Sequence, residues 1–172
     1  MKTLLLLRHA KSDWDDISFD DHERPLNPRG LKAAPRMGQL MRDLDMIPTL
    51  CLSSTAVRSR DTTTLAIDAM GQDVPTEFVE KLYSFGEGEA IEEVIAAQGG
   101  DASPLLIVAH NPAMQALALR LCDGGDVTGL AQMRMKYPTA GLSRIDFDID
   151  NWRELPGKTG TLVNFWRPRD IM

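Results

Sequence analysis

Residues 4–9 have the sequence LLLLRH, and this stretch decides how the rest of the chain is arranged. Four consecutive aliphatic residues bounded by charge are typical of a strand buried in the centre of a parallel sheet. The run stops at Arg8 and His9, and packing alone does not require either of these side chains. In open α/β sheets, ligands bind just beyond the carboxyl ends of the strands. The sequence therefore places this pair where a ligand is expected.

Two later segments repeat the pattern of a short strand followed by a polar group. The apolar run LLIVA (105–109) ends at His110, and the following Asn-Pro predicts a helix cap and first turn, with a helix to about residue 121. A short strand at 49–52 precedes hydroxyl residues that predict the cap of a helix over 56–70. Arg58 lies in its first turn, and helical side chains lean toward the N-terminus, so Arg58 can reach back over the strand ends.

The remaining segments continue the alternation of strands and helices. A helix is predicted from Asn27-Pro28 to about residue 44, and Pro35 is expected to kink it or to mark its true start. Its expected apolar stripe consists of Leu31, Ala34, Leu40, Met41 and Leu44. Other segments are expected to be strands at 76–79, 142–148 and 160–166, a helix at 89–98, and surface excursions at 10–27 and 123–138. This alternation predicts one domain over 1–172, a three-layer α/β/α sandwich with a mostly parallel sheet.

Composition limits the classes of partner. The 172 residues are 43% apolar and 26% charged, which suits a globular domain, and the net charge of −6 argues against a general nucleic-acid binder. No stretch approaches the length of a membrane span, and the N-terminal apolar run is too short for a secretory signal. Cys51 and Cys122 have no metal-ligand spacing. We expect reduced thiols in a cytoplasmic protein that contacts no membrane or nucleic acid and acts as a monomer.

The residue types at the predicted strand ends suit phosphoryl chemistry. A neutral imidazole is a good nucleophile toward phosphorus, and neighbouring cations would keep His9 unprotonated. The guanidinium groups of Arg8 and Arg58 would hold a phosphoryl group and neutralise its charge. His110 would hold a phosphoryl oxygen or donate a proton. Because these groups already supply positive charge, the chemistry requires no metal and no other cofactor.

Five segments in order resemble the motifs of the histidine phosphatase superfamily, whose fold is phosphoglycerate mutase-like, and within it the small SixA-type phosphohistidine phosphatases. The segments are LLLRHAKSDW (5–14), RPLNPRG (24–30), LSSTAVRSRDT (52–62), VAHNP (108–112) and YPTAGLSRIDF (137–147). One such motif would be weak, whereas five in the same order within a short chain are specific to the superfamily.

The resemblance implies roles for individual residues. His9 is the residue phosphorylated in the intermediate, and Arg8, Arg58 and His110 form the catalytic phosphate pocket. Arg24 is implied as an auxiliary substrate-binding residue, although an ion pair with a neighbouring carboxylate (Asp20, Asp21 or Glu23) explains it equally well. The implied activity is that of a phosphatase in signal transduction.

The chain departs from the superfamily at the general acid. Mutases and phosphomonoesterases of the superfamily carry a carboxylate after the third strand, where this chain has EKLYSFGEGEA (80–90) with Glu80, Glu87 and Glu89 and no clear match. An alkoxide leaving group needs a proton, whereas a protonated phosphoimidazole leaves as neutral imidazole. The expected substrate is therefore phosphohistidine on a histidine phosphotransfer-type protein.

Two other functions remain open at the level of sequence. The same chemistry could act on a small phosphate ester or sugar phosphate, which would require a general acid among the loop glutamates and a closed pocket. Alternatively, the chain could be a non-catalytic module that binds phosphorylated proteins. Recognition alone does not need a nucleophile, so the set of Arg8, His9, Arg58 and His110 argues against a simple binding module.

Overall fold

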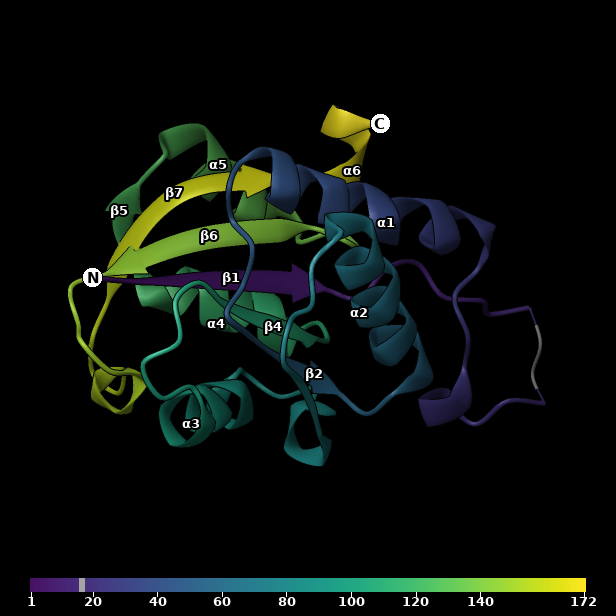
Figure 1. The fold of residues 1–172 in the computed structure, drawn as a ribbon, viewed down its shortest axis with the longest axis horizontal. Coiled ribbons are helices and arrows are strands. Elements are labelled where there is room, and N and C mark those ends of the chain that lie inside the picture. The colour runs from purple at the N-terminus through teal and green to yellow at the C-terminus, as the bar shows by residue number, and fades with distance from the viewer. Residues whose placement is uncertain (16–17) are drawn as a thin grey trace.

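The computed structural model describes residues 1–15 and 18–172, so part of the predicted excursion at 10–27 lies outside the described residues. Figure 1 shows a twisted sheet covered by helices on both faces. Its elements are β1 (Lys2–Arg8), η1 (Asp21–Glu23), α1 (Pro28–Asp43), β2 (Leu50–Ser54), α2 (Val57–Met70), β3 (Thr76–Val79), η2 (Glu80–Leu82), α3 (Glu89–Gln98), β4 (Leu105–Ala109), α4 (Ala113–Leu121), β5 (Cys122–Gly125), α5 (Val127–Met135), β6 (Leu142–Phe147), η3 (Trp152–Glu154), β7 (Gly160–Trp166) and α6 (Pro168–Ile171). Within these residues, no helix combines the length and apolar character that crossing a membrane requires.

The sheet confirms the predicted α/β architecture. Over the described residues it has seven strands in the order β3-β2-β4-β1-β6-β7-β5. Strands β3, β2, β4 and β1 are parallel neighbours, and β5 is parallel to β7, whereas β6 runs antiparallel to both β1 and β7. Because β2, β4 and β1 run side by side in one direction, their carboxyl ends meet at one edge of the sheet.

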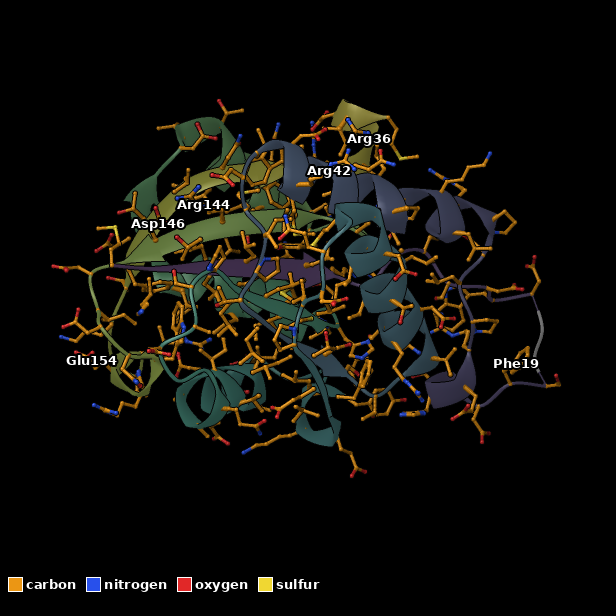
Figure 2. The ribbon with its side chains drawn as sticks, in the orientation of Figure 1. Phe19, Arg36, Arg42, Arg144, Asp146 and Glu154 are labelled. Atoms are coloured by element: carbon orange, nitrogen blue, oxygen red, sulfur yellow. The ribbon has the colours of Figure 1, made fainter. Side chains whose placement is uncertain are left out.

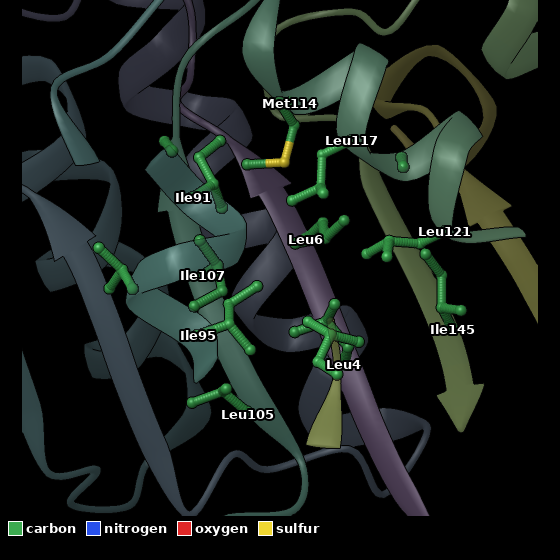
Figure 3. Close-up of a cluster of buried hydrophobic side chains, with 14 of the residues drawn as sticks. Leu4, Leu6, Ile91, Ile95, Leu105, Ile107, Met114, Leu117, Leu121 and Ile145 are labelled. Carbon is green, nitrogen blue, oxygen red and sulfur yellow. The ribbon is translucent and has the colours of Figure 1, made fainter. Parts of the chain in front are cut away.

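The four leucines of β1 divide between the two faces of the sheet. Leu4 and Leu6 pack with α3, α4 and neighbouring strands in the core cluster that Figure 3 shows. Leu5 and Leu7 pack on the opposite face with residues of α1 and α2. All four side chains are fully buried, as expected for a central strand, and each contributes about 2 kcal/mol of hydrophobic stabilisation. This anchoring fixes the direction in which the chain leaves β1 at Arg8.

Helix α1 begins at Pro28 as predicted, and the Asn27 side chain accepts a hydrogen bond from the Gly30 amide at 2.9 Å. The helix continues through Pro35, so the alternative that Pro35 marks its start is wrong.

The predicted apolar stripe is also partly wrong. Leu31 and Leu44 are exposed, and Ala33 and Met37 complete the buried face in their place. Arg36 of α1 donates to the Ile171 carbonyl and so joins α1 to the C-terminal helix (Figure 2).

Three local expectations differ from the structure. Helix α4 begins at Ala113, one residue later than predicted, because Pro112 takes the cap position and Asn111 Oδ1 accepts from the Gln115 amide. Helix α2 has no side-chain cap, and Ser54 Oγ accepts from the Ala56 amide before the helix begins. The segment 123–138 is not an irregular excursion, since it contains most of β5 and all of α5. Local hydrogen bonds at the helix ends account for the first two differences, whereas the third depends on the pairing of β5 with β7.

Candidate active site

The parallel pairing of β1 and β4 brings the two predicted histidines together. Arg8 pairs with Ala109 in the register of the sheet, and the His9 amide donates to the Ala109 carbonyl at 3.1 Å. His9 and His110 follow these positions directly, and their ring centroids are 5.1 Å apart. Both rings are buried. The sheet register therefore joins two residues that are a hundred positions apart in the chain.

The environment of His9 fixes which ring nitrogen is free. Nδ1 lies 2.7 Å from the Ala10 carbonyl oxygen. A carbonyl only accepts, so Nδ1 carries the hydrogen and Nε2 keeps its lone pair. The pKa of His9 is lowered to about 3. Burial is the main cause, the positive charges of Arg58, Arg8 and Arg24 act in the same direction, and the backbone hydrogen bond to Ala10 opposes them. His9 is therefore neutral at physiological pH, with Nε2 available as a nucleophile.

His110 is neutral for similar reasons. Its Nε2 lies 2.7 Å from Ser54 Oγ, and its Nδ1 lies 3.5 Å from Arg58 Nη2. A guanidinium only donates, so Nδ1 is the acceptor and Nε2 is the donor. Burial, together with the neighbouring His9 and Arg58, lowers the pKa of His110 well below its ordinary value. The end of β2 thus positions the second histidine through Ser54.

Arg58 and Arg8 lie beside these rings, and Arg58 is buried whereas Arg8 is half-buried. Arg58 comes from the first turn of α2, as predicted, and its side chain is almost fully buried. Arg8 is the last residue of β1, and its Nη1 donates to the Tyr137 carbonyl at 2.9 Å. Burial and the charge of Arg58 lower the pKa of Arg8, although an arginine stays charged in a protein.

Arg24 belongs to the same group of charges. It is buried, it contributes to the lowered pKa of His9, and its Nη1 donates to Ser12 Oγ. Its Nη2 also donates to Asp21 Oδ1 at 2.8 Å. The structure thus combines the two alternatives for Arg24, because this residue makes an ion pair with Asp21 and also lies near the predicted nucleophile. The exposed indole of Trp14 covers the Arg24 guanidinium at 3.5 Å.

The three arginines share an unusual feature. The Nε atoms of Arg8, Arg24 and Arg58 are buried and have no hydrogen-bond partner among the described residues. In the same part of the chain, the only other buried side-chain polar atom in this condition is Thr63 Oγ1. Buried donors are normally satisfied, and these three belong to the arginines whose charges act on His9, so they are candidate donors to an anion.

Two residues that sequence reasoning missed complete the site. Tyr83 and Phe85 place their rings 5.4 Å and 4.9 Å from the His110 ring. The Tyr83 hydroxyl donates to Asp21 Oδ2 at 2.5 Å. The sequence carries no signal for these two contacts, because no local pattern in residues 80–90 shows that the loop packs against His110.

The three loop glutamates do not take part in this network. Within the described residues, Glu80, Glu87 and Glu89 make no hydrogen bond or ion pair with the two histidines or with Arg8, Arg24 and Arg58. Glu89 accepts from the Glu87 amide, and the Glu87 carbonyl accepts from Arg120. Among the residues that the structure describes, Asp21 supplies the carboxylate that contacts Arg24 and Arg58.

Comparison with known proteins agrees with this geometry. The fold and the paired histidines among arginines define a phosphatase of the histidine-dependent class. The family described as histidine phosphatase superfamily (branch 1) matches residues 4–88. The chain is 34% identical over 165 residues to an uncharacterized protein of Mycobacterium tuberculosis, covering 95% of this chain and all of the relative. The chain belongs to the histidine phosphatase superfamily.

Solved structures with similar folds point to one branch of that superfamily. The putative phosphohistidine phosphatase SixA of Agrobacterium tumefaciens superimposes with a TM-score of 0.79 at 29% identity, covering 97% of this chain and 99% of that one. The putative phosphohistidine phosphatase SixA of Nakamurella multipartitia gives a TM-score of 0.80 at 26% identity, covering 97% of this chain and 96% of that one. The protein is therefore SixA-like in structure.

Proposed function

We propose that this protein is a phosphohistidine phosphatase that acts through a phosphorylated His9. The observation that carries the proposal is the pair of neutral, buried histidines surrounded by three arginines whose Nε donors are unsatisfied. Such a pocket offers a nucleophile and several donors for the same phosphoryl group. The similarity to two structures named as putative phosphohistidine phosphatases supports the assignment.

In the first step, His9 Nε2 attacks phosphorus and forms a P–N bond. The bond from phosphorus to the leaving imidazole breaks, and that imidazole keeps the electron pair. Arg8, Arg58 and Arg24 stabilise the charge on the equatorial oxygens, which is the largest contribution expected from such a site. The Nδ1 hydrogen bond to Ala10 holds the attacking ring in its orientation.

In the second step, a water attacks phospho-His9, the P–Nε2 bond breaks, and inorganic phosphate leaves. The negative charge of the bound phosphoryl group raises the affinity of His110 for a proton. His110 then holds a phosphoryl oxygen as a donor. Its own position depends on the 2.7 Å contact with Ser54.

Two features favour phosphohistidine over an ester as the substrate. None of the loop glutamates contacts the pocket in the described part of the chain, and a protonated phosphoimidazole needs no general acid to leave. In addition, exposed aromatic side chains surround the phosphate site, with Trp14 over Arg24 and Phe85 against His110. Aromatic residues are enriched in protein interfaces, so this rim suits a phosphorylated protein domain.

The deciding experiment compares two substrates. Phosphate release is followed from a phosphorylated histidine phosphotransfer domain and from p-nitrophenyl phosphate, both in the presence of a chelator. We expect fast release from the protein and slow release from the ester. The reverse result would make the protein a small-molecule phosphatase and would overturn the proposed substrate.

Variants separate an enzyme from a binding module. His9→Ala should lower turnover by at least about 1000-fold, because it removes the nucleophile of the proposed intermediate. Arg58→Ala should lower turnover by about 100-fold or more. Arg60→Ala is the matched control, because Arg60 is exposed on the same helix and lies near Phe78. Turnover that survives His9→Ala would exclude the phospho-His9 mechanism.

A further inference from the structure

The Asp21 carboxylate makes direct contact with the arginines of the site. Arg24 Nη2 donates to Asp21 Oδ1 at 2.8 Å, and Arg58 Nη2 donates to Asp21 Oδ2 at 3.0 Å. The hydroxyl of Tyr83 donates to the same Oδ2 at 2.5 Å. Asp21 therefore receives three side-chain hydrogen bonds, two of them from groups that the mechanism assigns to the phosphoryl group.

Arg58 shows this competition most clearly. Its Nη2 is bound to the Asp21 carboxylate, and its Nη1 donates to the Asp21 carbonyl at 2.6 Å. Both terminal nitrogens are thus directed at one residue. A carboxylate and a phosphoryl group both present oxygens that a guanidinium binds in a forked geometry. Asp21 consequently takes the place that an anionic ligand of Arg58 would take.

The two partners differ in their freedom to move. The Arg58 side chain is only 2% exposed, whereas that of Asp21 is 46% exposed. Asp21 begins η1, a three-residue turn that contains no buried residue. Segments with few buried contacts open locally at low cost. The arginine is therefore the fixed partner, and the carboxylate can leave without disturbing the core.

Asp21 is held as an anion in this position. Partial burial raises the pKa of its carboxyl, but hydrogen bonds from Arg24, Tyr83 and Arg58 outweigh this effect and hold the pKa well below its usual range. In this position the carboxyl is ionised, so it holds no proton for a leaving group. Its negative charge interacts with the guanidinium groups of Arg24 and Arg58.

We propose that the Asp21 carboxylate occupies the phosphoryl site of the free protein, and that the phosphoryl group must displace it to reach Arg24 and Arg58. The inference rests on the proposed function, because it takes these arginines as phosphoryl ligands. Asp21 is then a specificity-determining residue of the pocket. It lowers the affinity for free phosphate, which favours product release, and it favours substrates that make further contacts outside the pocket.

Anion binding tests this without requiring turnover. Sodium tungstate is titrated calorimetrically into the wild type, Asp21→Asn and Asp20→Asn at constant ionic strength. If Asp21 fills the site in about 70–90% of molecules, Asp21→Asn should lower the tungstate Kd by about 3–10-fold. Asp20→Asn is the matched control, because it removes an adjacent exposed carboxylate that contacts neither arginine. Its Kd should change by less than about twofold.

Each outcome decides the question. An unchanged or weaker affinity in Asp21→Asn would show that the carboxylate only positions the arginines, and would overturn the proposal. Tyr83→Phe removes one donor to Asp21 and should tighten tungstate binding in the same direction by a smaller factor. Weaker tungstate binding by Tyr83→Phe would also count against the proposal. Absence of tungstate binding to all of these proteins would overturn the anion pocket itself, whereas turnover by His9→Ala would reject only the proposed mechanism.

Discussion

His9 and His110 differ from most histidines of a protein surface because both are buried beside guanidinium groups. Burial is the main cause of their lowered pKa values, and the arginine charges add to it. The hydrogen bond from His9 Nδ1 to the Ala10 carbonyl leaves Nε2 as the nitrogen that would attack in the proposed mechanism. A nucleophile that is neutral and fixed in one tautomer needs no adjacent base to activate it.

The same lowered pKa values make the free energy of unfolding decrease in acid. Above about pH 7.5, both histidines are neutral in the folded and the unfolded chain, so they do not affect the pH dependence. Below that pH the unfolded chain binds protons that the folded chain does not bind, until the pH approaches about 3 for His9. Each histidine should therefore lower the free energy of unfolding by up to about 1.4 kcal/mol per pH unit as the pH falls from about 6.5 to 5.

Urea unfolding at several pH values measures this effect. Carboxyl groups contribute to the slope as well, so the wild type is compared with His110→Gln, which lacks one of the two buried histidines. The variant should lose less stability between pH 6.5 and pH 5. An identical slope in the two proteins would contradict the lowered pKa of His110.

At the scale of elements, two glycines allow α1 to approach its neighbours. A side-chain carbon added at Gly38 would lie 2.0 Å from the Ala66 carbonyl oxygen on α2. One added at Gly30 would lie 2.1 Å from the Lys11 carbonyl oxygen, in the segment that follows His9. Because backbone atoms occupy both positions, α1 supports α2 and the loop of the nucleophile through direct backbone contact.

Gly38→Ala should therefore push α1 away from α2 and lower the free energy of unfolding by about 1–3 kcal/mol. Thermal or urea unfolding measures the loss. Gly124→Ala is the control, because a carbon added there meets no atom within 4 Å and the residue has no positive φ. Equal stability of the two variants would show that the helices do not depend on this close approach.

At the scale of the whole molecule, the charge is distributed unevenly. The chain has a net charge of −6, yet Arg8, Arg24 and Arg58 meet at one edge of the sheet. The parallel strands β2, β4 and β1 deliver their carboxyl-terminal residues to this edge. The negative surface and the positive pocket together favour an anionic group that fits the pocket over anionic polymers in general.

In the proposed mechanism the arginines provide the charge that stabilises the transition state, so we expect turnover to be unchanged by excess EDTA. Sulfate should inhibit competitively, since it is an anion with the geometry of phosphate, and chloride at equal ionic strength is the control. A rate that falls in EDTA and returns on addition of Mg²⁺ would contradict this expectation. Inhibition equal for sulfate and chloride would indicate general screening instead of binding in the pocket.

The sequence by itself determined the alternation of strands and helices, the burial of Leu4 to Leu7, and the placement of histidines after β1 and β4. These features follow from local pattern, since an apolar run, a cap or a terminating glycine acts within a few residues. The ordered motifs also indicated the superfamily correctly. The roles of Arg8, His9, Arg58 and His110 remain predictions that the geometry supports.

Tertiary structure alone decided the contacts between distant segments. It exposed Leu31 and Leu44, built β5 and α5 from residues expected to be irregular, and brought Tyr83 to Asp21. Asp21 lies 62 positions from Tyr83 and 37 from Arg58, so no local pattern could predict that these groups meet. The physical reason is that side-chain contacts depend on how helices and loops pack against the sheet, and packing is a property of the whole chain.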